Sequence, residues 1–312
     1  MQGGKTCVSM RKMAGGRVVT RSRFGIHLGL GQSCNFQCGY CTQGKHDNSK
    51  FGEECAQDLK LCGKINERLA GYISSATGGR MNPSLTFIGG EPTLYPVGEY
   101  LGILRETIAP SEVILITNLS AEIRFYGEMA DKWPLRITAS YHGAQFSLER
   151  FKRKCVEVRS AGVPLSIQFT LTGSNTEECL DLKRFAGENG MGFHPSLMRV
   201  AGKVVAAVPE GVDIADPPTY ACTFSDGTQR RMPRLCNMPD FPIRGMACSI
   251  ARDSLYVRHD GELLYNLGCR SGRNRIGNLF EGDCGFVFDG SPVTCVNDLC
   301  SCVIPKWLRR MA

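Results

Sequence analysis

The chain has 312 residues, of which 42% are hydrophobic, and this length suits one large domain with a smaller one. No apolar stretch approaches the roughly 20 residues that span a membrane, and no apolar core follows the basic N-terminal residues, so neither a membrane protein nor a signal peptide is expected. The net charge of +7 comes from 37 basic and 30 acidic residues spread along the chain. Such a mild excess does not favour a nucleic-acid-binding surface and hints only at an anionic partner.

The 16 cysteines are many for a chain of this length. Disulfide-rich sequences belong mainly to small secreted domains with poor cores, whereas several of these cysteines lie at spacings typical of metal ligands. We therefore expect metal binding in a reducing compartment, and a cytoplasmic protein.

The first notable stretch is an octet, C-N-F-Q-C-G-Y-C, that spans residues 34–41. It follows a polar segment over 1–20, expected to be a tail or an edge element, and a strand expected over 24–30. Cys34, Cys38 and Cys41 on one short loop leave a four-coordinate site one ligand short, so an iron–sulfur cluster there would have one iron open to another ligand. The alternative is a zinc site closed by His46.

Downstream, helical and strand patterns alternate. Apolar spacing and turn residues predict helices over 54–76, 97–108, 121–132, 148–160 and 176–188. Strands are expected over 85–88, 113–116, 135–141, 163–171 and 193–200. Strands separated by helices of this length indicate repeated βα units, so the expected fold class is α/β with a parallel sheet. Cys55 and Cys62, on or beside the first helix, are expected to be small core residues.

Polar residues occur where these strands end, which is the edge that carries the functional site in barrels of parallel strands. Each is expected either to contact a ligand or to cap the strand and form a turn. His142 could act in proton transfer or only satisfy a local hydrogen bond. These strand-end residues are Thr117, Asn118, Ser140, His142, Thr170, Thr172 and Arg199.

Residues 201–247 are rich in proline and break the alternating pattern. They are expected to form an irregular connection across the mouth of the barrel, because a long loop of this kind is usually functional or disordered. Cys222 and Cys236 lie in it, either as buried thiols or as groups that donate a hydrogen atom or bind iron.

The C-terminal part carries further cysteines around a predicted β-hairpin. Asp260-Gly261 between apolar runs is a hairpin signal, and residues 276–279 follow it. The cysteines of this part are Cys248, Cys269, Cys284, Cys295, Cys300 and Cys302.

The octet resembles the C-x3-C-x-Φ-C motif of the radical S-adenosylmethionine (radical SAM) superfamily, with Tyr40 as the aromatic Φ. Gly89-Gly90-Glu91-Pro92, after the second expected strand, resembles its G-G-E-P element, although alone it would be an ordinary turn. The resemblance implies that Cys34, Cys38 and Cys41 hold a [4Fe–4S] cluster whose open iron chelates S-adenosylmethionine, and that the G-G-E-P element contacts the amino group of this cofactor. Reductive cleavage would release a 5′-deoxyadenosyl radical that abstracts a hydrogen atom. By position, the strand-end residues would contact S-adenosylmethionine or the substrate, with Ser140 and Arg199 the strongest candidates.

The same resemblance implies a partial (β/α)6 barrel over 21–200, after the tail over 1–20. The connecting segment over 201–247 would lead to an auxiliary-cluster domain of the SPASM/twitch type over 248–312. We expect one auxiliary [4Fe–4S] cluster, held by Cys248, Cys269 and two or three of Cys295, Cys300 and Cys302, with Cys284 as a bystander. A zinc-stabilised tail is the alternative.

The expected function is radical modification of a ribosomally made peptide by cross-linking, epimerisation or thioether formation. The alternatives are radical oxidation or rearrangement of a small molecule such as a sugar, and a non-catalytic iron–sulfur protein. The expected partners are an electron donor such as flavodoxin or ferredoxin, and a separate peptide-recognition protein, since no winged-helix recognition domain fits before Cys34.

Overall fold

The computed structural model describes residues 7–9, 24–41, 46–79, 83–172, 174–200, 203–204, 220–224, 229–232, 246–248, 254–266, 274–282, 286–288, 293–294 and 308–310. The short strands near both ends of the chain and within 199–248 are described by their backbone alone.

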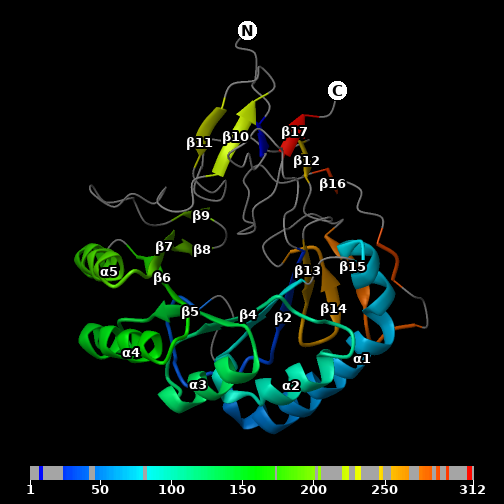
Figure 1. The fold of residues 1–312 in the computed structure, drawn as a ribbon, viewed down its shortest axis with the longest axis horizontal. Helices are drawn as coiled ribbons and strands as arrows, with labels where there is room; N and C mark the ends of the chain where they lie inside the picture. The colour runs from blue at the N-terminus through cyan, green and yellow to red at the C-terminus, as the bar shows by residue number, and fades with distance from the viewer. Residues whose placement is uncertain are drawn as a thin grey trace.

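Six parallel strands in chain order form the centre of the described structure. They are β2 (Gly25–Gly29), β3 (Ser84–Ile88), β4 (Glu112–Thr117), β5 (Leu135–Tyr141), β6 (Leu165–Leu171) and β7 (Gly192–Leu197). Helices connect them and cover the outer face of the curved sheet in Figure 1: α1 (Phe51–Thr77), α2 (Val97–Leu104), α3 (Ile123–Lys132), α4 (Leu148–Ser160) and α5 (Thr176–Glu188). The predicted α/β class is confirmed, with six parallel strands and five connecting helices.

Alternating side chains separate the two faces of this sheet. In β5, Ile137 and Tyr141 are buried, whereas Arg136 is exposed and Ser140 is half-buried. The buried set faces the helices, since the ring centroids of Tyr141 and Phe151 in α4 lie 5.1 Å apart. Successive residues of a strand point to opposite faces, so the polar residues of β5 lie on the concave face.

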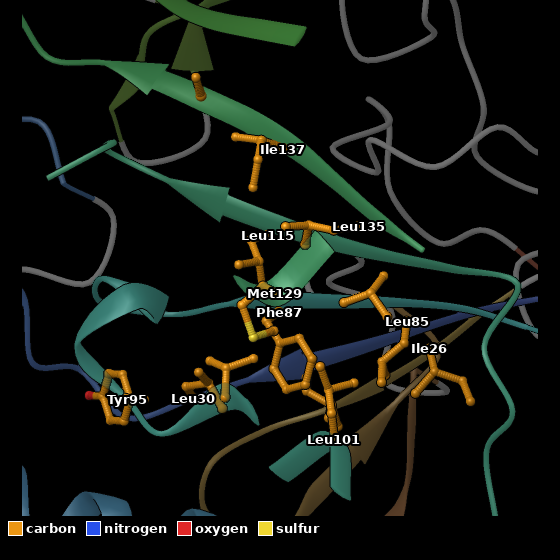
Figure 2. Packing of buried hydrophobic residues seen from close by; sticks show 14 of the residues in the cluster. Ile26, Leu30, Leu85, Phe87, Tyr95, Leu101, Leu115, Met129, Leu135 and Ile137 are labelled. Atoms are coloured by element: carbon orange, nitrogen blue, oxygen red, sulfur yellow. The ribbon is translucent and has the colours of Figure 1, made fainter. Parts of the chain in front are cut away.

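A continuous apolar core fixes the strands against the helices. Phe87 of β3 is fully buried in this core, together with Leu101 of α2 and Met129 of α3 (Figure 2). Burial of a side chain of this size contributes about 1.5–3 kcal/mol to stability. The strand ends that carry the candidate site therefore rest on a rigid base.

The expectation that 201–247 lacks secondary structure is wrong for part of this segment. It contains β9 (Lys203–Val204), which pairs with β8 (Arg199–Val200), and it contains β10 (Tyr220–Phe224), β11 (Gln229–Met232) and β12 (Met246–Cys248). The prolines lie outside these strands, and the Tyr, Thr and Phe residues of β10 favour extended structure. β10 pairs on one side with β11 and on the other with β1 (Cys7–Ser9), so the N-terminal segment does supply an edge strand.

The predicted C-terminal hairpin is confirmed, and it extends the barrel sheet. β13 (Ser254–Val257) and β14 (Glu262–Leu264) are antiparallel, with Gly261 at a φ of 82° in the turn. β13 also pairs in parallel with β2, and β15 (Arg275–Asn278) pairs with β14. The hairpin therefore lies beside the strand that leads into the cysteine octet.

A buried ion pair joins this hairpin to α1. Asp58 is 1% exposed, and its Oδ1 accepts a hydrogen bond from His259 Nδ1 at 2.7 Å. Its other oxygen accepts from the backbone N–H of Gly31, just after β2. Asp58 thus connects the hairpin turn to the segment that precedes Cys34.

Within the described part of the chain, none of the helices has the length and hydropathy that crossing a bilayer requires.

This pair predicts a pH-dependent stability. The hydrogen bond to Asp58 raises the pKa of His259, and the charges of Glu54 and Asp260 act in the same direction. A histidine whose pKa is raised by folding adds stability below its ordinary pKa of about 6.5, and this stability is lost as pH rises through the folded value. We expect the free energy of unfolding, measured by chemical denaturation, to fall as pH increases above about 6.5.

Two variants check the assignment to His259. His259→Asn keeps a side-chain N–H donor but does not titrate, so it should remove this decrease, whereas His259→Leu should cost about 3 kcal/mol because Asp58 stays buried without its partner. Arg275→Ala in the neighbouring strand β15 is the control, because its pairs with Glu262 and Glu281 do not involve Asp58 or His259, so the pH profile should stay unchanged. Identical pH profiles for the wild type and His259→Asn would contradict the prediction.

Candidate functional site

The cysteine octet directly follows β2 at the carboxyl edge of the parallel sheet. Cys34 is buried, and Cys38 and Cys41 are half-buried. The Cys41 N–H donates to the carbonyl of Cys38 at 3.0 Å, which forms a tight turn between these two cysteines. The three thiols thus lie on one loop at the edge where barrels of this type carry their sites.

Cys34 is held from both sides by a residue that sequence reasoning missed. The Oδ1 of Asn48 accepts from the Cys34 N–H at 3.0 Å, and its Nδ2 donates to the Cys34 carbonyl at 3.1 Å. The N–H of Phe36 also donates to Cys34 Sγ at 3.4 Å, which stabilises negative charge on this sulfur. No spacing rule in the sequence points from Cys34 to Asn48.

The segment before Cys34 is fixed by two carboxylates one turn apart on α1. Glu54 accepts from the backbone N–H groups of Gln32 and Ser33, each at 3.0 Å, and Asp58 accepts from that of Gly31 at 3.1 Å. Burial raises the pKa of Glu54, but hydrogen bonds from Tyr95, Ser33 and Gln32 outweigh burial and lower it. Glu54 therefore stays charged and holds the peptide that enters the octet.

The described side chains do not form a site for a single ion at the octet. Among the described residues, no three His, Cys, Asp or Glu side chains gather closely enough to hold one metal ion. Burial raises the pKa of Cys34 to about 11, and the charges of Glu91, Cys38 and Cys41 contribute to the rise. In a cluster, each thiolate would bind a separate iron. Nδ1 of His46, the candidate zinc ligand, lies against the carbonyl of Gln32 instead.

The G-G-E-P loop after β3 is pressed against the segment that enters the octet. The Gly90 N–H donates to the Gly31 carbonyl at 3.0 Å, and the Glu91 N–H donates to the Ser33 carbonyl at 2.9 Å. A Cβ atom on Gly90 would lie 1.9 Å from the carbonyl oxygen of Ser33. Only glycine fits this backbone approach, which is a physical reason for glycine at this point of the motif.

Glu91 is a buried link between strand ends. Its Oε1 accepts from Thr117 Oγ1 and Thr93 Oγ1, each at 2.6 Å, and from the Thr93 N–H at 3.1 Å. Its Oε2 accepts from the Asn118 N–H at 2.7 Å. Burial raises the pKa of Glu91, and these hydrogen bonds oppose the rise. The carboxylate thus joins the G-G-E-P loop to the end of β4, while Pro92 begins a short 3-10 helix.

Among the strand-end residues, Asn118 reaches the cysteine loop most directly. Its Nδ2 lies 2.9 Å from Asn35 Oδ1 and 4.0 Å from Cys34 Sγ, while its Oδ1 accepts from the Ser120 N–H. Thr117 is buried and engaged with Glu91. Asn118 is therefore the strand-end amide next to the octet.

The remaining strand-end residues lie in three different settings. Ser140 and Thr170 are half-buried on β5 and β6, on the side of the sheet opposite the helices. Thr172 forms the turn to α5, since its N–H donates to Asn175 Oδ1 at 3.0 Å. Arg199 lies in β8, beyond the end of β7, and its side chain is outside the described part.

His142 lies directly on the cysteine loop. Its Nδ1 is 2.8 Å from the hydroxyl oxygen of Tyr40 and 3.4 Å from Cys38 Sγ. The rings of His142 and Tyr40 are stacked, with centroids 5.8 Å apart. Burial lowers the pKa of His142 to about 4. Burial also raises the pKa of Cys38, and the Tyr40 hydroxyl opposes that rise.

The other predicted cysteine sites fall on residues of which little is described. Cys222 lies in β10 and Cys248 in β12, both described only by their backbone. The predicted sites at Cys236, Cys269, Cys284, Cys295, Cys300 and Cys302 lie outside the described residues. Cys62 is buried and Cys55 packs against the core, as expected for these two.

Comparisons with known proteins give a likeness of fold. No family model matches the sequence, and no curated protein matches it. Among solved structures, Streptococcus suis SuiB bound to S-adenosylmethionine is similar over 84% of this chain, with a TM-score of 0.51 and 13% identity. The chain spans 64% of the length of that SuiB chain, which is less than two thirds.

Native anSMEcpe with bound AdoMet and the Cp18Cys peptide is similar over 84% of this chain and 79% of its own, with a TM-score of 0.50 and 13% identity. In both comparisons the sequence identity is low, so the likeness concerns the arrangement of the strands and helices. In this chain, that arrangement is the mostly parallel sheet with its connecting helices. The chain therefore has the fold of the radical SAM superfamily.

Proposed function

We propose that this chain is a radical SAM enzyme that acts on a ribosomally made peptide. The observation that carries the proposal is the packing of the octet loop against the G-G-E-P loop, at the edge of a fold shared with structures that contain S-adenosylmethionine. When bound at Cys34, Cys38 and Cys41, a reduced [4Fe–4S] cluster would give one electron to the sulfonium of S-adenosylmethionine, which yields methionine and a 5′-deoxyadenosyl radical that takes a hydrogen atom from the substrate.

The residues of the chain have separate tasks in this proposal. Three thiolates hold the cluster, while Asn48 and the Phe36 N–H orient and stabilise the Cys34 thiolate. Glu91 positions the strand ends that would surround S-adenosylmethionine, because its side chain is committed to Thr93, Thr117 and Asn118. Ser140 and Thr170 are the candidate hydrogen-bonding groups toward the cofactor or the substrate.

An auxiliary [4Fe–4S] cluster in the C-terminal part belongs to the same proposal. β12, which ends at Cys248, pairs with β16 (Val293–Thr294), and β16 ends directly before Cys295. β12 also pairs with β17 (Leu308–Arg310), which follows Cys302 by a few residues. This pairing supports a site built from Cys248 and the cysteines at 295–302. Such a cluster could accept one electron from the substrate radical, which would complete a two-electron oxidation of the substrate.

The strand β11 offers one place where a peptide substrate could bind. Within the described residues, β11 pairs only with β10. An extended peptide can bind the edge of a strand through main-chain hydrogen bonds. The anSMEcpe structure, which has the same fold, also contains a peptide. The electron donor would be a protein such as flavodoxin or ferredoxin.

The first test of this function concerns the radical cluster. Cys34→Ala, Cys38→Ala and Cys41→Ala should each abolish formation of 5′-deoxyadenosine from S-adenosylmethionine, because two thiolates hold a cluster poorly. Cys55→Ala is the matched control, since this cysteine packs against the core outside the octet, and it should keep wild-type cleavage. Anaerobically reconstituted protein and product analysis by chromatography give the measurement. Wild-type cleavage by any one of the three octet variants would refute the assignment.

The second test concerns the substrate. A candidate peptide encoded beside the gene is incubated with enzyme, S-adenosylmethionine and reductant in deuterated water and then analysed by mass spectrometry. Loss of two hydrogens indicates cross-linking or oxidation, whereas gain of one deuterium indicates epimerisation completed by a thiol such as Cys222 or Cys236. An unchanged peptide, together with turnover of a small metabolite, would replace the peptide by a small-molecule substrate.

A further inference from the structure

His142 contacts the octet through two aromatic rings and through its Nδ1 atom. One face stacks on Tyr40 at an interplanar angle of 17°, and the imidazole forms a T-shaped pair with the ring of Phe36, with centroids 5.9 Å apart. The ring is thereby held in one orientation, with Nδ1 directed at the Tyr40 hydroxyl and at Cys38 Sγ. A phenylalanine would fill the same space but would bring no nitrogen to the sulfur.

The hydrogen-bonding capacity of these three groups is limited. An iron-bound thiolate carries only lone pairs, so it can only accept hydrogen bonds. The hydroxyl oxygen of Tyr40 lies 2.8 Å from the same Nδ1, and a hydroxyl oxygen can accept a hydrogen bond, so Tyr40 and Cys38 can share one Nδ1–H. In imidazole the position of the proton is set by the partner of each nitrogen. Without a proton on Nδ1, a nitrogen lone pair would face the sulfur lone pairs at 3.4 Å, so a bound thiolate favours the tautomer with Nδ1–H.

We propose that His142 is a positioning residue that raises the reduction potential of the radical cluster by donating an Nδ1–H hydrogen bond to Cys38 Sγ. Reduction adds one negative charge to a cluster and its thiolates. A donor aimed at one of those sulfurs stabilises the reduced form more than the oxidised form, and hydrogen bonds to the sulfurs are among the factors that set cluster potentials. The inference rests on the proposed function, because it requires a cluster at Cys34, Cys38 and Cys41.

Tyr40 also has a second role, which is to position the imidazole of His142. Its ring supports the imidazole from one side, and its hydroxyl lies within hydrogen-bonding distance of Nδ1. Tyr40 therefore helps to keep Nδ1 directed at Cys38, in addition to its place as the aromatic residue of the motif.

The potential is measured by an EPR-monitored redox titration of the reconstituted full-length protein. The radical cluster is identified as the species whose EPR signal changes when S-adenosylmethionine is added, which separates it from any auxiliary cluster. We expect a lower midpoint potential in His142→Phe and a potential near that of the wild type in His142→Asn, whose amide N–H can replace Nδ1–H. Phe146→Leu is the matched control. Phe146 packs on Phe36, with centroids 6.1 Å apart, without a polar contact to the cysteines, so its variant should keep the wild-type potential.

A second measurement needs no variant that could misfold. Wild-type protein containing 15N-histidine should show a weak nitrogen coupling in pulsed EPR of the reduced radical cluster, because an N–H···S hydrogen bond carries spin density to Nδ1. Absence of this coupling, or an unchanged potential in cluster-loaded His142→Phe, would overturn the inference while leaving the proposed function intact. If the wild type holds no cluster that responds to S-adenosylmethionine, the proposed function fails, and this inference fails with it.

Discussion

The backbone of Gly90 lies against the carbonyl of Ser33, and this approach constrains the whole edge of the sheet. Hydrogen bonds between the loops after β2 and β3 continue the ladder of the two strands past their ends. The buried carboxylate of Glu91 then adds the end of β4 to the same unit. Because Cys34 follows Ser33 directly, the position of the octet depends on three strand ends that cannot move independently.

A second constraint comes from α1 and from the C-terminal hairpin. Glu54 and Asp58 together bind three successive peptide N–H groups before Cys34, and His259 of the hairpin is the side-chain partner of Asp58. Parts of the chain about 200 residues apart therefore meet beside the octet. A change that displaces the hairpin should therefore also shift the segment that leads into the cysteine octet, since His259 and the Gly31 N–H both bind the carboxylate of Asp58.

Much of the fold could be predicted from the sequence, because its signals are local. The alternation of apolar runs and helical spacing indicates six strands separated by five helices, and Asp260-Gly261 marks a hairpin turn; the structure confirms both. The strand β10 was missed because prolines on both sides of it suggested an irregular segment, whereas its pairing with β1 depends on residues some 210 positions away.

The site could be predicted only where its residues form a motif with a characteristic spacing in the sequence. The cysteines of the octet and the glycines at 89 and 90 form recognisable patterns. Asn48, Asp58 and Tyr95 could not be found, because their roles arise from side chains that reach across the fold to backbone groups of Gly31, Ser33 and Cys34. Glu91 was expected to lie near the cofactor, but the structure adds that its oxygens are largely engaged by neighbouring residues.

The proposed function requires that the octet hold a cluster with one iron open to S-adenosylmethionine. Electron–nuclear double resonance on the reduced protein, with S-adenosylmethionine labelled with 17O in its carboxylate, tests this requirement. We expect a 17O coupling large enough to require a bond between the carboxylate and an iron of the cluster. A cluster that binds in the octet but shows no such coupling would contradict the proposed function, because its fourth iron would then be closed to the cofactor.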